Sequence, residues 1–577
     1  MYQKQHLIYI LVFFHTFICI ACNATDISDN TNNATYILSS PTIIPTPTLN
    51  LEKEIERVTS NKIINHIPNG ILSFASAGFP EHFDVHEENS NSLLSMGPGI
   101  SYSRLLKFDG KEILCDLCLD WEQVSNIEYI FHIRDDIYWH DKKPVSGRKL
   151  ITKDIVYSLN RVKNNDWFSS SIINSIDVVE EIGRSKMRIL LKYPDSDILM
   201  RLAHGNIKIV PFELLNLRDG LRFGPTIGTG PWIFNEDSVD RFDFVANPNY
   251  FETDLPQAKE FVITPVSSEN TRIALVLSEK INISLVDYWS IKRLLNVEDL
   301  EINQISISSL KSSNFDKFED CLSNRYPCIN VMPNYSKGII FALNSTRYAL
   351  DDVLFRRYIF SHLDLNSYES LSIGLPITSK DWKLNTKSES SYTNIPQLAE
   401  SIKYDLSNSA NIERLNHPLN FYAGDYGDEY IALGMKYHTM LTNAGINVNL
   451  EFLNPKEYHE KIWVKQDYDL TLGPKIPTDI PNAFLYGMIH STGRYSITNH
   501  QLDFLDSIIE KQNTNDLDRS GHIIDLQRYV LENALLFEPI TDYVGILVGN
   551  NIQNYSSVDI NIRNAESLHW AELAVSH

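Results

Sequence analysis

The chain has 577 residues, 43% of them hydrophobic, and a formal net charge of −22 at pH 7. A single hydrophobic core rarely grows to this size, so the length predicts at least two lobes. The acidic balance, without a cluster of Lys and Arg, argues against binding to nucleic acid.

The amino terminus is typical of an export signal. Lys4 precedes a nearly unbroken apolar run over residues 7–21, which is short for a membrane span. The sequence CIAC at residues 19–22 resembles a bacterial lipobox, so we expect residues 1–21 to be removed and Cys22 to be acylated. The alternative is an ordinary signal peptide followed by a chance cysteine.

The next segment has the composition of a flexible tether. Residues 23–50 are rich in Asn, Thr, Ser and Pro, carry little charge and show no apolar period. We therefore expect residues 22–64 to be disordered. A tether after a lipidated cysteine predicts an exported protein that is anchored to the cell membrane and faces the periplasm or the outer cell surface.

Residues 127–162 predict a strand, a tight turn and a helix. The apolar side chains at 129, 131 and 133 alternate with Ile130, His132 and Arg134, a period of two that is typical of a half-buried strand. The stretch DKKPVSG has turn chemistry, and Thr152 stands at the expected N-cap of the helix that follows. His140 and Asp141 are acid/base and metal-ligand types, but this pair supplies neither a nucleophile nor a third ligand. We expect a structural role for this segment and no catalytic residue.

Four cysteines lie beyond the amino-terminal region, where an exported protein can oxidise them. Cys321 and Cys328 flank the loop-like stretch LSNRYP, and we expect a disulfide between them. Cys115 and Cys118 have the spacing of a redox or zinc site, yet no second such pair accompanies them. Buried thiols or a strained local disulfide are favoured over a functional site there. Since His, Cys and Asp form no tight cluster, direct metal ligation is also disfavoured.

The later sequence predicts α/β units. GTGPW at residues 228–232 suits a tight turn where the chain enters a strand. Residues 419–423 predict a strand, followed by the loop GDYGD and by a helix that ends at Gly445 with a left-handed cap. Strand, helix and strand in this order place loops at strand ends, where ligands bind.

Taken in order, these motifs resemble one large family, the extracytoplasmic solute-binding proteins of the dipeptide, oligopeptide and nickel type (family 5). The family's signature reads Trp-Glu, then F-x-L-R-x-G-V-x-W-H-D-G-x-P, then A-x-D-V-V-x-S. It is matched by Trp121, Glu122, Phe131, Ile133, Arg134, Ile137, Trp139, His140, Asp141, Pro144, Asp154, Ile155, Val156 and Ser158. Further matches are FDVH at 83–86, YSRLLKF at 102–108, GTGPW at 228–232, NPNYF at 247–251, FALN at 341–344 and LDDV at 350–353.

The resemblance implies an α/β, two-lobed clamshell of the periplasmic-binding-protein type II class, in its large peptide-binding form with an extra subdomain. Lobe one would hold residues 65–284 plus 542–577, with the subdomain over about 85–210. Lobe two would hold residues 285–541, and two strands near 283–286 and 539–544 would connect the lobes.

The resemblance also implies a function. Such a protein is the substrate-binding component of an ABC importer, which captures a peptide or peptide-like solute between its lobes and delivers it to a membrane permease. We expect no enzymatic activity, no cofactor and a monomer. The sequence contains no G-x-S-x-G, H-E-x-x-H or phosphate-binding loop that would indicate an enzyme.

The loop that would bind a peptide's ammonium departs from the family pattern. In peptide-binding members it reads R-x-G-W-x-x-D, followed by P-x-x-F-L. Here Gly473, Pro481, Phe484 and Leu485 match, whereas Thr471, Pro474 and Pro477 replace the Arg, Trp and Asp. Asp479 is two residues away and could substitute for the missing carboxylate. Lys475 would instead favour an anionic or carbonyl-rich ligand, unless it points to solvent.

Ligand-binding candidates follow from position in the expected fold. They are Ser76, Ala77, Gly78 and Phe79 after the first strand, Asp425 and Tyr426 in the glycine-rich loop, and Thr471, Lys475 and Asp479. Two alternatives stay open. The same fold could bind an oligosaccharide or a metal chelate, or it could serve a sensory or adhesive lipoprotein without a transport role.

Overall fold

The computed structural model describes residues 68–108, 112–216, 221–237, 239–287, 290–291, 294, 327–363, 365, 372–376, 382, 384, 408–478, 480–514, 518–555 and 570–575. The signal peptide, the tether, Cys22, Cys321 and Asp479 lie outside these residues. Within them, no helix combines the length and the apolar character that crossing a membrane requires.

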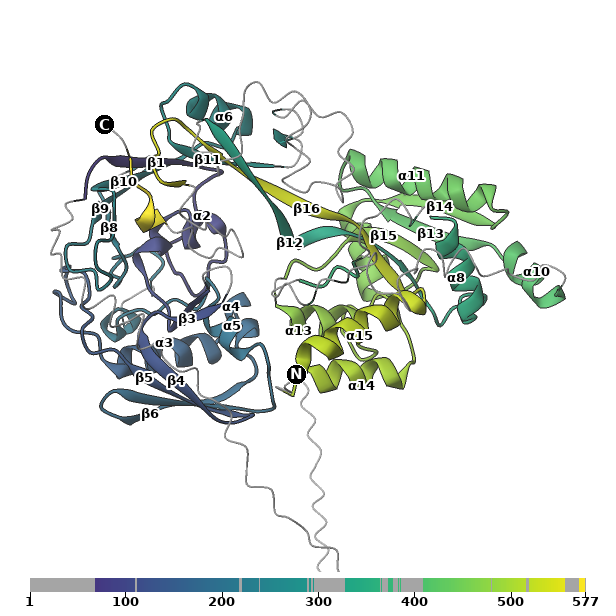
Figure 1. Ribbon diagram of the computed structural model, residues 1–577, viewed down its shortest axis with the longest axis horizontal. Helices are drawn as coiled ribbons and strands as arrows, with labels where there is room; N and C mark the ends of the chain where they lie inside the picture. Colours follow the sequence, from purple (N-terminus) through teal and green to yellow (C-terminus); the bar gives the residue numbers. More distant parts are fainter. Residues whose placement is uncertain are drawn as a thin grey trace, which may run out of the picture. The chain divides into compact units, whose positions relative to one another are not determined.

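A ten-stranded mixed sheet extends through both lobes (Figure 1). Its strand order is β14 (Val448–Leu453), β13 (Leu419–Gly424), β15 (Leu470–Pro474), β12 (Cys328–Leu343), β16 (Leu536–Val548), β11 (Ile283–Asp287), β1 (Ile71–Ser76), β10 (Glu260–Pro265), β9 (Phe242–Ala246) and β8 (Trp232–Asn235). The 16-residue β12 and the 13-residue β16 pair antiparallel along most of their length. At one end β16 pairs with β11, and at the other β12 pairs with β15.

These two long strands connect the lobes. Cys328 at the start of β12 is buried with Ile283 and Ile546 in the core around β1 and β10. Residues from Ile339 onward are buried in the core of the other lobe, with Phe341, Tyr437 and Phe537 in edge or tilted ring contacts. The strand that leaves the first core in the described chain is thus β12, which begins well after residues 283–286. The residue bounds of the lobes stay a prediction.

The first lobe also contains the subdomain. A four-stranded antiparallel sheet has the order β4 (Cys118–Ser125), β5 (Glu128–Ile133), β7 (Lys186–Leu191), β6 (Ile176–Gly183). Helix α3 (Thr152–Lys163) packs on it through Ile155, Leu159 and Val162. Shorter elements complete the lobe: α2 (Asn91–Leu94), β2 (Leu106–Phe108), β3 (Ile113–Cys115), α4 (Phe168–Ile172), α5 (Ile198–Leu202) and α6 (Glu269–Leu277).

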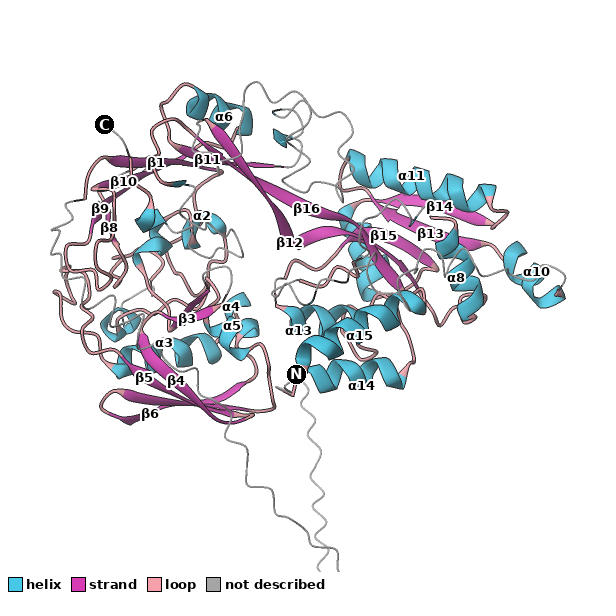
Figure 2. Ribbon diagram, viewed as in Figure 1, coloured by secondary structure: helices cyan, strands magenta, loops and turns pink. Residues whose placement is uncertain are grey.

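In the second lobe, helices lie on both sides of β13, β14 and β15 (Figure 2). They are α8 (Val353–Ser361), α10 (Ser409–Asn416), α11 (Asp428–Asn443), α12 (Pro455–Tyr458), α13 (Pro481–Phe484), α14 (Asp503–Gln512) and α15 (Arg519–Glu532). Helix α11 ends as predicted, because Gly445 follows it with a φ of 79°, a left-handed conformation that glycine adopts without strain.

The signature segment, residues 127–162, folds as the predicted strand, turn and helix, with one correction. The N-cap is Ile151 and not Thr152. The Asp154 carboxylate reaches back to accept from the Ile151 backbone N–H at 3.1 Å, whereas the Thr152 hydroxyl donates to the Arg184 carbonyl at 3.1 Å. Because the carboxylate at the third helical position supplies the capping contact, the hydroxyl is free to tie the helix to the sheet.

His140 joins the signature segment to the GTGPW turn. Its Nδ1 accepts from the Gly228 N–H at 3.3 Å, so Nε2 carries the proton and donates to the Gly230 carbonyl at 3.0 Å. The ring is 1% exposed. Burial lowers the pKa of His140 to about 4, so the imidazole is neutral at physiological pH. Its role is structural, as the sequence indicated.

The cysteines of the CxxC pair form a local disulfide. Cys115 and Cys118 are bonded to each other, which is one of the two structural states that the sequence left open. Cys328 is also disulfide-bonded. Since Cys321 lies outside the described residues, the Cys321–Cys328 bond stays a prediction.

Candidate ligand-binding cleft

A cavity of about 1350 Å³ lies between the two lobes. The first lobe contributes residues around α4 and α5, among them Phe168, Tyr193 and Arg201. The second lobe contributes the chain after β15 together with a loop that precedes α14 and the end of α14 itself. Leu285, Lys337 and Val544 line the cavity from the strands that connect the lobes or lie beside them.

Most charges on the first-lobe wall are neutralised within that wall. Asp195 is 1% exposed, with Arg201 Nε at 2.8 Å and the Ser175 hydroxyl donating at 2.6 Å. Burial lowers the pKa of His204 to about 3, so this lining histidine is neutral. A ligand therefore meets a paired acid and base here, not a free charge.

The second lobe and the connecting strand β12 carry exposed charges of both signs. Lys337 and Arg494 are exposed, and both line the cavity. The Arg494 guanidinium lies 5.4 Å from the Tyr495 ring centroid, which orients it without neutralising it. The Glu510 side chain is 66% exposed, with its carboxylate 3.8 Å from His490 Nε2. The cleft thus offers groups for a carboxylate and for an ammonium.

Aromatic side chains line both sides of the cleft. Phe168 is 50% exposed and Tyr193 is 46% exposed on the first lobe. Tyr486 and Tyr495 face the cavity from the second lobe. Rings of this kind contact apolar side chains or stack on planar groups with little loss of conformational entropy.

Thr471 and Lys475 are turned into the second lobe. The Thr471 hydroxyl is buried and donates to the Tyr422 carbonyl at 3.1 Å. The Lys475 ammonium, whose side chain is 1% exposed, donates to Glu538 at 2.8 Å and to the Gly374 carbonyl at 2.9 Å. Lys475 borders a separate cavity of about 340 Å³. Its charge is therefore satisfied by a strand that connects the lobes, neither by solvent nor by the large cleft.

The other predicted residues lie near strand ends. The Ser76 hydroxyl donates to the Gly78 carbonyl at 3.2 Å, and Phe79 meets the Phe242 ring edge-on. Tyr426 contacts other tyrosine rings of its own lobe, and Asp425 donates its backbone N–H to Leu453. Of the predicted ligand-binding residues that the structure describes, none lines the 1350 Å³ cleft, which instead meets Ile476, Pro477, Thr478 and Ile480.

Sequence reasoning missed Tyr193, Arg494 and Glu510 as cleft residues. They stand in a loop before a short helix, in an irregular loop and on an amphipathic helix. Such positions have no periodic or spacing signal, because exposure to a cleft looks the same in sequence as exposure to solvent.

The family model for "Bacterial extracellular solute-binding proteins, family 5 Middle" matches residues 112–496. The chain belongs to this family. A family 5 protein is an extracytoplasmic substrate-binding protein of an ABC importer and not an enzyme.

Two relatives of this family 5 protein are similar over one segment. The probable di/tripeptide-binding protein 5 of Pseudomonas aeruginosa (strain UCBPP-PA14) is 30% identical over 223 residues, which are 34% of this chain and 41% of that protein. The dipeptide-binding protein of Escherichia coli (strain K12) is 27% identical over 223 residues, which are again 34% of this chain and 41% of that protein. The matched segment thus spans about two fifths of each relative.

Solved structures match the fold over most of the chain. The ABC transporter substrate-binding protein CtaP from Listeria monocytogenes aligns with a TM-score of 0.66 at 14% identity, covering 89% of this chain and 100% of CtaP. HbpA2 from Haemophilus parasuis aligns with a TM-score of 0.67 at 14% identity, covering 88% and 100%. The two-lobed α/β clamshell expected from the sequence is therefore confirmed.

Proposed function

We propose that this family 5 protein captures a peptide or peptide-like solute in the 1350 Å³ cleft and delivers it to a membrane permease. The cleft itself is the observation that carries the proposal. Its volume exceeds the roughly 300–1,000 Å³ of common small-molecule pockets, so it has room for an extended ligand of several residues. The similarity to a probable di/tripeptide-binding protein and to a dipeptide-binding protein supports the same class of ligand.

The charges of the cleft suit the two ends of a peptide. Arg494 and Lys337 would bind a ligand carboxylate, and Glu510 would bind an ammonium group. Backbone hydrogen bonds would hold the chain between them, a mode that tolerates different sequences. Pro477 lines the cleft at the position where peptide-binding members have the ammonium-binding Asp, so another residue must do this work. Asp479 stays a candidate beside Glu510.

The mechanism of capture is a shift of population. An open form admits the solute, and a ligand that contacts both lobes stabilises the closed form by its higher affinity for it. Acylation of Cys22 would keep the protein at the membrane, where the closed form meets the permease. We propose that the protein works as a monomer.

Native mass spectrometry of the purified mature protein tests the ligand class. We expect a bound mass that fragments into amino acids. A bound saccharide or metal chelate, or the absence of binding to every member of a defined peptide library, would reject peptide as the ligand. Uptake of the identified solute in a strain that lacks the anchored protein separates a transport role from a sensory or adhesive one.

Arg494→Gln tests the proposed carboxylate site with the peptide identified in that way. Loss of one charged hydrogen-bonding group should weaken binding about tenfold. The control is Arg347→Gln, which changes an arginine of the second lobe whose guanidinium is held by Asp467 at 2.7 Å and does not line the cleft. Equal affinities of the two variants would show that Arg494 does not touch the ligand.

A further inference from the structure

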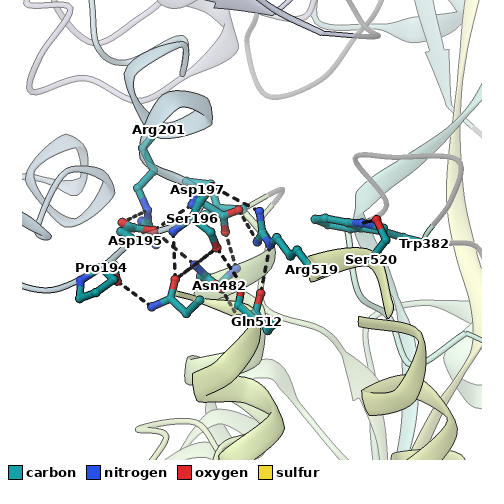
Figure 3. Close-up of polar contacts among 12 residues, drawn as sticks. Pro194, Asp195, Ser196, Asp197, Arg201, Trp382, Asn482, Gln512, Arg519 and Ser520 are labelled. Atoms are coloured by element: carbon teal, nitrogen blue, oxygen red, sulfur yellow. Dashed lines mark hydrogen bonds and ion pairs between the residues drawn. The ribbon is translucent and has the colours of Figure 1, made fainter. Parts of the chain in front are cut away.

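The two lobes also touch each other directly, without any ligand between them. The contact joins the latch loop, defined as residues 194–197 before α5, to the second-lobe helices α13, α14 and α15 (Figure 3). In Figure 1, α5 and α13 face each other below the strands β12 and β16. The latch loop thus closes a side of the cleft where the connecting strands do not run.

Asn482, in the first turn of α13, is the centre of this contact. Its backbone N–H donates to Asp197 Oδ2 at 2.7 Å, and its side-chain amide donates to Asp195 Oδ1 at 3.3 Å. Within the second lobe, the Gln512 amide donates to the Asn482 side-chain oxygen at 2.6 Å. Asn482 is 3% exposed and Gln512 is fully buried, so water does not compete for these bonds.

Asn513, after the end of α14, binds the backbone of the latch loop. Its side-chain amide donates to the Pro194 carbonyl at 3.0 Å, and its side-chain oxygen accepts from the Ser196 N–H at 3.1 Å. Together these two bonds hold the backbone of the latch loop on both sides of Asp195. The Ser196 hydroxyl donates in turn to the Gln512 carbonyl at 3.2 Å.

An ion pair completes the contact. Arg519 Nη2 donates to Asp197 Oδ1 at 2.6 Å, and Nη1 donates to the Ser196 carbonyl at 3.3 Å. The guanidinium is held in place by its own lobe, since Nε donates to Gln512 at 3.2 Å and the group lies 4.8 Å from the Trp382 ring centroid. Asp197 is only 3% exposed, so the pair is largely removed from solvent.

An apolar contact lies next to the polar one. Ile480 belongs to the second lobe in sequence, yet it is 3% exposed and buried in the hydrophobic core of the first-lobe subdomain. Ala483 packs against the same core. Opening the lobes would expose this isoleucine to water in addition to breaking the hydrogen bonds.

We propose that the latch loop, with Asn482, Asn513 and Arg519, is a ligand-independent latch that keeps the lobes closed when the cleft holds no solute. Contacts that exist only in the closed form stabilise that form whether or not a ligand is present. Asp195, Asn482 and Asn513 also line the cleft, so a solute enters on this side only after the latch opens. The latch therefore acts on both the capture and the release of solute.

Small-angle scattering on ligand-free protein tests the latch. The sample is full mature protein whose native mass spectrum shows no bound solute. We expect the wild type to scatter as the closed form, and Arg519→Ala to have a larger radius of gyration because its closed-to-open ratio falls about tenfold. An open wild type, or an Arg519→Ala variant as compact as the wild type, would overturn the proposal.

A second variant and a control distinguish opening of the lobes from misfolding of a variant. Asp197→Ala removes the same ion pair from the first lobe, so it should enlarge the radius of gyration even if Arg519→Ala disturbs the packing of Trp382. Arg347→Ala, which breaks an ion pair inside the second lobe, should leave the radius unchanged. Cooperative thermal unfolding of each variant verifies that it is folded. Expansion of the control to the same extent would contradict a specific latch.

Discussion

The signature segment of the first lobe and the chain after β15 in the second lobe satisfy their polar groups in different ways. Asp154 in the signature binds Arg148, Trp139 and the Phe212 N–H, all of them within the first lobe. After β15, by contrast, Lys475 reaches Glu538 on a connecting strand, and Asn482 reaches the other lobe. The segment that identifies the family is therefore scaffold, whereas the segment that departs from the peptide-binding pattern joins the second lobe to a connecting strand and to the first lobe.

The largest effect should come from breaking the Lys475–Glu538 pair. Lys475→Met leaves the Glu538 carboxylate, 2% exposed, without its cation, so we expect the free energy of unfolding to fall by about 3–5 kcal/mol. Urea denaturation measures the loss. The double variant Lys475→Met/Glu538→Gln should recover part of it, because no buried charge remains unpaired. A single variant as stable as the wild type would show that the pair is not a structural element of this loop.

A smaller effect should come from the matching change in the signature segment. Asp154→Asn removes a fully buried charge, but Arg148 keeps the Glu213 carboxylate at 2.5 Å. We expect the free energy of unfolding to fall by about 2–3 kcal/mol, since the hydrogen bonds lost are those to a charged group. The same urea experiment ranks this variant against Lys475→Met, and a reversed order would contradict the comparison.

The signature segment should also carry a pH dependence. The pKa of His140 is lowered by burial to about 4 from an ordinary value near 6.5, so its contribution to stability is complete above pH 6.5 and is lost as the pH falls toward 4. The expected loss is about 2 kcal/mol at pH 5 relative to pH 7.

Denaturation of His140→Gln and wild type at pH 5, 6, 7 and 8 measures this contribution of His140 to stability. The variant should show a shallower fall in stability below pH 6.5 and a constant difference from wild type above it. His86 and His204, whose pKa values burial also lowers, remain in both proteins, so part of the slope persists. Parallel curves would mean that His140 does not titrate with unfolding.

The smallest effect should come from the local disulfide beside the signature segment. Cys115→Ser/Cys118→Ser opens a loop that encloses two residues, and a short loop restricts the unfolded chain only slightly. We expect a loss of about 2 kcal/mol or less in urea denaturation. A loss as large as that of Lys475→Met would indicate that the disulfide contributes as much to the free energy of unfolding as the Lys475–Glu538 pair does.

Local patterns predicted the local structure well. The alternation in residues 129–134 and the turn residues after it identified β5 and the start of α3, because both depend on neighbours in sequence. The cap was misplaced by one residue. Asp154 and Thr152 are both capping types, and only the fold decides that the Thr152 hydroxyl donates to the Arg184 carbonyl while Asp154 caps the helix. Gly445 was predicted from the end of a helical period.

The sequence by itself determined the family, the two-lobed α/β clamshell and the structural role of His140, because ordered motifs and short-range periodicity carry that information. Only the tertiary structure decided where the charges of the second lobe point. Lys475 meets Glu538, 63 residues away, and Asn482 meets Asp197, 285 residues away. The direction of such a side chain depends on what the whole fold brings beside it, and no local pattern records that.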